Sequence, residues 1–187
     1  MLIWIIAGLF IAIIAAVIFI YNGLVAKRLM SDNGWSDITV QLKRRADLIP
    51  QILATVKAYA AHEKELFADV IEKRNAAIAA GDNPKHRGGA ESALSRPVGK
   101  LIALKEDYPD LKAAQNFLDL QNELSDTEDK IEMARRFYNG AVREQNIAVQ
   151  SFPANIIAGL FRFSSRDFFE IETSDAAMPS LDSEGVN

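Results

Sequence analysis

The sequence predicts an all-α protein in which one N-terminal transmembrane helix precedes an antiparallel hairpin or bundle of long helices. Three observations support this fold class. The chain opens with an apolar run long enough to span a bilayer, and two later stretches repeat their apolar residues at the spacing of a helix face. No stretch alternates apolar and polar residues with the period of two that predicts a β-strand.

The transmembrane anchor is predicted over residues 1–21. Residues 2–20 carry no polar side chain, and a helix of this length, at about 1.5 Å per residue, matches a hydrocarbon core of roughly 30 Å. No lysine or arginine precedes the run, which disfavours a cleaved signal peptide because such peptides begin with a basic segment. Basic residues follow it instead, at Lys27, Arg28 and residues 43–45. By the positive-inside rule we expect a single-pass protein of the cell (inner) membrane, with the N-terminus outside and the C-terminal domain cytoplasmic.

Two heptad-like apolar stripes predict the long helices of the domain, residues 22–163, which should pack as in a coiled coil. The first stripe consists of Trp35, Ile38, Leu42, Ile49, Ile52, Val56, Tyr59, Leu66 and Val70. The second runs from Leu111 to about Phe152 and contains Phe117, Leu124, Ile131, Tyr138, Val142, Val149 and Phe152. Pro50 is expected to bend the first helix, and Pro153 is expected to end the second.

Between the two stripes the chain is predicted to turn at residues 81–89, where GDNPKHRGG combines residue types that favour loops. A further helical stretch continues until Tyr108 and Pro109, and the sequence leaves open whether these make a kink or a full reversal. A turn centred near Lys85 makes the numbers of facing residues sum to about 173. That register pairs Arg45 with Glu128, Leu42 with Ile131, Ile49 with Leu124, Val56 with Phe117 and Trp35 with Tyr138. A full reversal at Pro109 is expected to shift these pairs.

Charged residues interrupt both stripes, at Arg45, Glu63, Glu128 and Arg135. They could line a binding groove, but we favour the interpretation that they pair with one another and set the register of the helices. A rival register, with facing numbers that sum to about 198, would pair Glu63 with Arg135. The neighbouring Lys43 and Arg44 are expected to make a modest contact with anionic lipid headgroups.

The end of the chain divides into an apolar and an acidic part. Residues 154–163, ANIIAGLFRF, are too short to cross a bilayer. The register returns Phe152 to the level of Tyr21, so we expect residues 154–163 to meet the membrane surface. Residues 164–187 form an acidic tail that we expect to be largely disordered, from about Thr173 onward, and dispensable for folding.

The sequence predicts no catalytic, cofactor-binding or metal site. The chain has no cysteine and only two histidines, which leaves few metal ligands. The string HEKEL, beginning at His62, has Leu66 where the metalloprotease pattern HExxH requires its second histidine. Residues 81–89 lack the lysine of a phosphate-binding loop at the required spacing. A net charge of −4 provides no basic surface for nucleic acid.

Several motifs follow one another in the order found in a known family: RRADLIP, YPDLKA, TEDKI, RRFYN and SFPANIIAG. On these motifs the chain resembles the LemA family over residues 21–169, although Gly34 and Ala58 stand where alanine and glycine are usual. The resemblance implies an N-terminal anchor followed by an antiparallel helical domain, without an established enzymatic activity. Members are often encoded near membrane metalloproteases.

Together these features predict a membrane-anchored helical scaffold or adaptor without catalytic activity, which could self-assemble at the membrane. The alternative is a regulator or sensor that partners a membrane enzyme such as a metalloprotease. The expected partners are the lipid bilayer and either a second copy of the chain or another membrane protein. No nucleic acid, cofactor or small-molecule substrate is expected.

Overall fold

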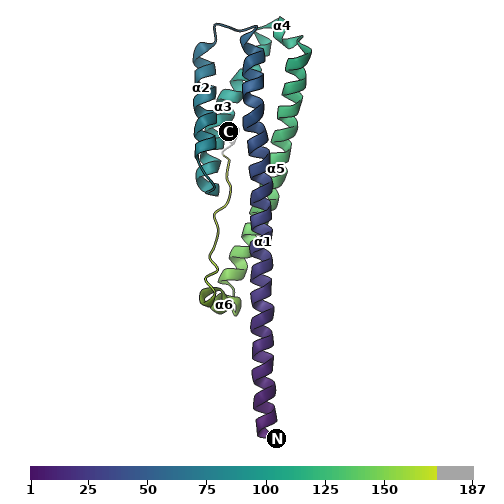
Figure 1. Ribbon diagram of the computed structural model, residues 1–187, viewed down its shortest axis with the longest axis vertical. Helices are drawn as coiled ribbons and strands as arrows, with labels where there is room; N and C mark the ends of the chain where they lie inside the picture. Colours follow the sequence, from purple (N-terminus) through teal and green to yellow (C-terminus); the bar gives the residue numbers. More distant parts are fainter. Residues whose placement is uncertain (172–187) are drawn as a thin grey trace, which may run out of the picture.

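The computed structural model describes residues 1–171, which form helices joined by turns and end in an extended segment (Figure 1). The elements are α1 (Leu2–Lys57), α2 (Lys64–Ala79), α3 (Pro84–Ala103), a short 3-10 helix η1 (Leu104–Glu106), α4 (Pro109–Lys112), α5 (Gln115–Gln150) and α6 (Ala154–Leu160). No β-strand occurs within residues 1–171. The predicted all-α class, with a long apolar N-terminal helix followed by a bundle, is confirmed.

α1 is a single helix of 56 residues that contains both the predicted anchor and most of the first stripe. Its N-terminal part extends beyond the rest of the molecule (Figure 1), is not covered by other elements, and is long and apolar enough to cross a membrane. Its C-terminal part lies inside the body. Pro50 is exposed within α1 and does not end the helix, so the loss of one backbone hydrogen bond is tolerated there.

The body is centred on the antiparallel pair of α1 and α5, in the predicted register. Arg45 Nε lies 2.9 Å from Glu128 Oε1, and the ring centroids of Trp35 and Tyr138 are 5.5 Å apart. The three apolar pairs of that register also share core clusters, namely Leu42 with Ile131, Ile49 with Leu124 and Val56 with Phe117. The predicted register of the two long stripes is therefore confirmed, and the rival pairing of Glu63 with Arg135 is not formed.

The connection between the two stripes differs from the predicted one. The loop expected at residues 81–89 is confined to the turn before Pro84, and the residues after it belong to the first turns of α3. Asn83 caps this helix, because its side-chain oxygen accepts a hydrogen bond from the His86 N–H at 3.0 Å. An asparagine cap followed by proline is a strong helix start. The loop prediction was therefore wrong beyond residue 83.

Tyr108 and Pro109 belong to a full reversal rather than a kink. η1 and α4 carry the chain from the end of α3 to the start of α5 (Figure 1). The expected shift of the α1–α5 pairs did not follow. α2 and α3 have 16 and 20 residues and pack against each other, so they run out and back over similar lengths and return the chain to the level where α1 ended.

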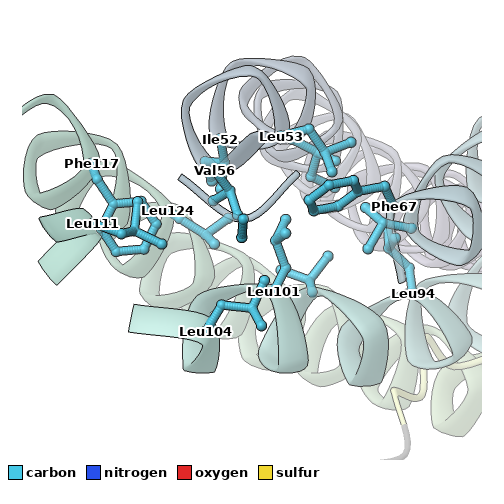
Figure 2. Packing of buried hydrophobic residues seen from close by; sticks show 14 of the residues in the cluster. Ile52, Leu53, Val56, Phe67, Leu94, Leu101, Leu104, Leu111, Phe117 and Leu124 are labelled. Carbon is cyan, nitrogen blue, oxygen red and sulfur yellow. The ribbon is translucent and has the colours of Figure 1, made fainter. Parts of the chain in front are cut away.

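Three apolar clusters stabilise the body. The first joins α1, α2, α3 and α5 at the end far from the anchor, where Phe67, Leu101 and Phe117 lie around Val56 (Figure 2). The second joins α1 and α5 near Tyr138 and includes Phe169. The third packs Leu24 of α1 against Ile157 and Ala158 of α6. Burial of such side chains contributes roughly 1.5–3 kcal/mol each.

After α6 the chain runs back along the body as an extended segment, residues 164–171 (Figure 1). The side chain of Asn139 donates a hydrogen bond to the Phe169 carbonyl at 3.0 Å and accepts one from the Phe169 N–H at 2.9 Å. Asn146 binds the backbone of Arg166 in the same two-way manner. These eight residues of the predicted tail therefore pack on α5, while residues 172–187, with the predicted disorder, lie outside the described residues.

Candidate functional site

The centre of the body contains a buried charged cluster around Arg45, which is 1% exposed. Its Nη1 lies 3.3 Å from Glu91 Oε2, and its Nη2 donates a hydrogen bond to Ser95 Oγ at 2.9 Å. The contact with Glu128 at 2.9 Å is an ion pair without hydrogen-bond geometry. Arg45 therefore connects α1 to both α3 and α5.

Glu91 is as buried as Arg45 and has a second basic partner, Arg87 on the preceding turn of α3. Burial raises the pKa of the Glu91 carboxyl, and the positive charges of Arg45 and Arg87 oppose that rise. The sequence had not indicated Glu91, Ser95 or Arg87 as members of the cluster. The spacing of Arg87 and Glu91, four residues apart on a helix, was the available signal.

The other charged stripe residues do not join this cluster. Glu63 accepts a hydrogen bond from the Tyr108 hydroxyl at 3.3 Å. Arg135 donates one to the carbonyl of Ile171 at 3.4 Å. Only Arg45 and Glu128 of the four pair with one another, and the cluster holds helices together rather than lining a groove.

The expected contact of Lys43 and Arg44 with lipid headgroups stays a prediction, which the length of α1 disfavours. Arg44 lies 24 positions beyond Ile20, which is about 36 Å along a helix, and this exceeds the reach of an arginine side chain. Arg44 Nη2 instead forms an ion pair with Glu123 Oε1 at 2.8 Å.

The end of the body next to the anchor has an aromatic and apolar surface. Tyr21 on α1 packs edge-on against Phe161 and Phe163, with ring centroids 4.8 and 5.7 Å apart. On α6 and its flanks, large apolar side chains remain exposed: Phe152 at 80%, Ile156 at 60% and Leu160 at 71%. Residues 154–163 therefore lie beside α1 near Tyr21, as expected, and their contact with the membrane surface stays a prediction.

An open cavity of about 610 Å³ lies between α1, the α2–α3 turn and the extended segment. Asp32 and Arg166 form an ion pair across it at 2.5 Å. Burial raises the pKa of Tyr138, which also lines it, to about 12, and the Tyr138 hydroxyl donates a hydrogen bond to the Asp167 carbonyl at 2.9 Å.

His62 and Glu63 lie in the turn between α1 and α2, away from the charged cluster around Arg45. In the part of the chain that the structure describes, no group of three or more histidine, aspartate and glutamate side chains is arranged to hold a metal ion. The geometry thus supplies helix-to-helix contacts and a membrane-proximal surface.

A sequence model of the LemA family matches residues 34–182. The chain belongs to the LemA family. It is 26% identical to protein LemA of Metamycoplasma hominis over 179 residues, covering 89% of this chain and 81% of that one. It is also similar to magnetosome proteins MamQ 1 and MamQ 2 of Paramagnetospirillum magneticum, each at 24% identity over 185 residues, covering 86% of this chain and 68% of theirs. None of these names denotes an enzyme, and together with the apolar N-terminal helix the relationship identifies a membrane protein.

The ion pair between Arg45 and Glu128 can be measured by a double-mutant cycle with Arg45→Met and Glu128→Gln. The side chain of Glu128 is 42% exposed, so solvent screening reduces the interaction, and we expect a coupling of about 0.5–1 kcal/mol. Thermal unfolding of the four proteins in detergent gives this number. A cycle on Glu63 and Arg135 serves as the control and should show no coupling, because those residues do not meet.

Proposed function

We propose that this LemA-family protein is a non-catalytic scaffold or adaptor that α1 anchors in the cell membrane and that assembles with further copies of itself. The observation that carries the proposal is the continuity of α1, which runs from the apolar span into the centre of the body without a break. A helix that is both the anchor and the central element couples the position of the body to the bilayer. A flexible linker after the span would instead separate the two.

α6 supports a position of the body directly at the membrane surface. Its buried residues Ile157 and Ala158 pack on α1 close to the end of the span, so its exposed residues Ile156 and Leu160 lie at the same level. Exposed apolar side chains beside a transmembrane helix are stabilised by the boundary of headgroups and acyl chains. In this arrangement α6 holds the base of the body against the bilayer.

Self-assembly is supported by exposed apolar side chains on the paired helices. Val40 on α1 is 59% exposed, and Met133 and Phe137 on α5 are 61% and 50% exposed. By helical spacing, Val40 lies on the side of α1 that faces away from α5. Met133 and Phe137 are four residues apart on one side of α5 and form an exposed apolar pair there, and Phe137 lies against α1 at Gly34. Apolar patches of this kind on a protein surface are typical of interaction sites.

Crosslinking in intact cells, followed by mass spectrometry, tests this proposal. We expect crosslinks between copies of the chain that involve α1 and α5, and large homo-oligomers after extraction in mild detergent. Met133→Glu should reduce both, because it places a charge in the exposed apolar pair of Met133 and Phe137 on α5, whereas Ile71→Glu on α2 should not. Ile71 is the matched control, since it is 45% exposed and lies outside the patch. Crosslinks only to a different membrane protein, at defined stoichiometry, would instead favour a regulator of that protein.

The orientation of the anchor can be tested separately, because the chain has no cysteine. A single cysteine at Ser183 should resist a membrane-impermeant thiol reagent in intact cells and react after permeabilisation. The reason is the basic sequence after the span and its absence before it. A cysteine inserted between Met1 and Leu2 should show the opposite pattern. Labelling at position 183 in intact cells would contradict a cytoplasmic body.

A further inference from the structure

We propose that the base of the body binds the phosphate of an anionic phospholipid headgroup through Arg28 and Arg162, with the glycerol and upper acyl chain lying in an adjoining groove that has both aromatic and charged walls. The binding site is a small cavity of about 130 Å³ lined by Arg28, Gln145, Arg162, Phe163, Ser164 and Arg166. This inference rests on the membrane anchoring in the proposed function, but not on self-assembly.

The charges around this cavity favour an anion. Arg166 is paired with Asp32 at 2.5 Å, so its charge is largely compensated. The guanidinium groups of Arg28 and Arg162 have no hydrogen-bond or ion-pair partner among residues 1–171. Lys27, the neighbour of Arg28, is paired with Glu144 at 3.0 Å and does not contribute. Two guanidinium groups that have no partner among the described residues, beside one cavity, suit a phosphate, which accepts several hydrogen bonds from such donors.

A second observation indicates a ligand that also donates a hydrogen bond. The side chain of Gln145 is 2% exposed and lines the cavity. Its Nε2 donates to the Ser164 carbonyl at 3.1 Å, whereas its Oε1 has no partner. A buried acceptor without a donor is costly. A headgroup hydroxyl would satisfy it, and this favours a hydroxyl-bearing headgroup such as that of phosphatidylglycerol over a bare phosphate.

The adjoining groove favours a lipid over a soluble anion. It has a volume of about 340 Å³ and is lined by Tyr21, Val25, Arg28, Leu29, Asp32, Phe161 and Phe163. Arg28 and Phe163 belong to both cavities. Along α1, the groove residues Tyr21 and Val25 lie nearer the span than Arg28, whereas the charged Asp32 lies beyond it. The apolar part of the groove is therefore on the membrane side, which matches the order of acyl chain and headgroup in a bilayer.

The geometry of α1 also brings Arg28 to the headgroup region. Side chains on a helix point back toward its N-terminus, which here is the membrane side. Arg28 follows Ile20 by about 12 Å along the helix, and the polar layer of a bilayer extends roughly 5–8 Å beyond the hydrocarbon core. A long arginine side chain directed toward the bilayer covers the remaining distance.

The test uses the full chain in a neutral detergent and measures thermal unfolding while a soluble short-chain lipid is added. We expect dihexanoyl phosphatidylglycerol to raise the Tm in a saturable manner, since a ligand that binds only the folded state stabilises it. Dihexanoyl phosphatidylcholine and inorganic phosphate should bind at least about tenfold more weakly. If inorganic phosphate acts at the same concentrations as phosphatidylglycerol, the site binds free phosphate and the lipid assignment is wrong.

Variants locate the site. Arg28→Gln with Arg162→Gln should weaken phosphatidylglycerol binding by about tenfold or more, and Val25→Trp should weaken it by filling the membrane side of the adjoining groove. Arg143→Gln is the matched control, because Arg143 is exposed on α5 at the level of Met30 in the α1–α5 register but lines neither cavity. Equal losses in the double variant and the control would overturn the site. The double variant should still form crosslinks between copies in cells. A loss of lipid binding can therefore be distinguished from a loss of self-assembly.

Discussion

Phe169→Ala is expected to lower the free energy of unfolding by about 3–5 kcal/mol, the range for removing a fully buried phenylalanine. Phe169 is 0% exposed and packs edge-on against Trp35, with ring centroids 5.5 Å apart. It belongs to the cluster that joins α1 and α5. For a chain of this size, thermal unfolding in detergent should show a fall in Tm of roughly 10 °C.

Phe168→Ala is the matched control for this prediction. Phe168 is the preceding residue, but it is 37% exposed and lies outside the apolar clusters, so its replacement should cost less than about 1 kcal/mol. Similar losses for the two variants would show that the extended segment does not dock as described. A third variant, Gly88→Ala on α3, should weaken the packing of the same extended segment, because a Cβ at this position would overlap the Glu170 carbonyl.

The α1–α5 register could be predicted from the sequence because two independent patterns agreed on it. The apolar stripes allow several registers that differ by a heptad, and the charges at Arg45 and Glu128 select one of them. That selection is physical, since an unpaired charge among buried apolar residues would be strongly destabilising. The predicted register was correct although the predicted connection was not, because the α2–α3 hairpin returns the chain to the level where α1 ended.

Neither the α2–α3 hairpin nor the extended segment could be predicted from the sequence, and the reason differs between the two. Residues 81–89 contain proline and glycine, which favour loops, but Asn83 and Pro84 begin a helix and Gly88 is accommodated where α3 meets the backbone of Glu170. The extended segment was predicted to belong to an acidic, largely disordered tail, although it contains the apolar residues Phe168 and Phe169. The segment docks through the amide side chains of Asn139 and Asn146 on α5, and no local pattern indicates such a contact.

The same limit applies to the candidate sites. The buried cluster was predicted only for the two residues on the long stripes, because its other members lie on α3, whose position was not known. The proposed lipid site combines Arg28 from α1, Gln145 from α5 and Arg162 from the turn after α6. These residues are adjacent only once α6 has folded back on α1, so sequence spacing could not bring them together.

Arg45→Met is expected to lower the free energy of unfolding by about 3 kcal/mol, because it leaves the buried carboxylate of Glu91 without its main partner. Arg87 remains beside Glu91, which keeps the loss at the lower end of the range for a broken buried pair. Arg44→Met is the matched control on the adjacent residue. Its ion pair with Glu123 is about half exposed on both sides, and its loss should cost less than about 1 kcal/mol.

The pH dependence of Arg45→Met identifies Glu91 as the cause. Burial already raises the pKa of Glu91 in the folded protein, and removal of the Arg45 charge should raise that pKa further. A carboxyl with a higher pKa in the folded than in the unfolded state binds more protons when folded, so stability falls as the pH rises between those two pKa values. The variant should therefore approach the parent protein in acid and be most impaired near neutral pH. Adding Glu91→Gln should remove this dependence and restore part of the stability, and an unchanged pH profile would assign the loss to packing instead.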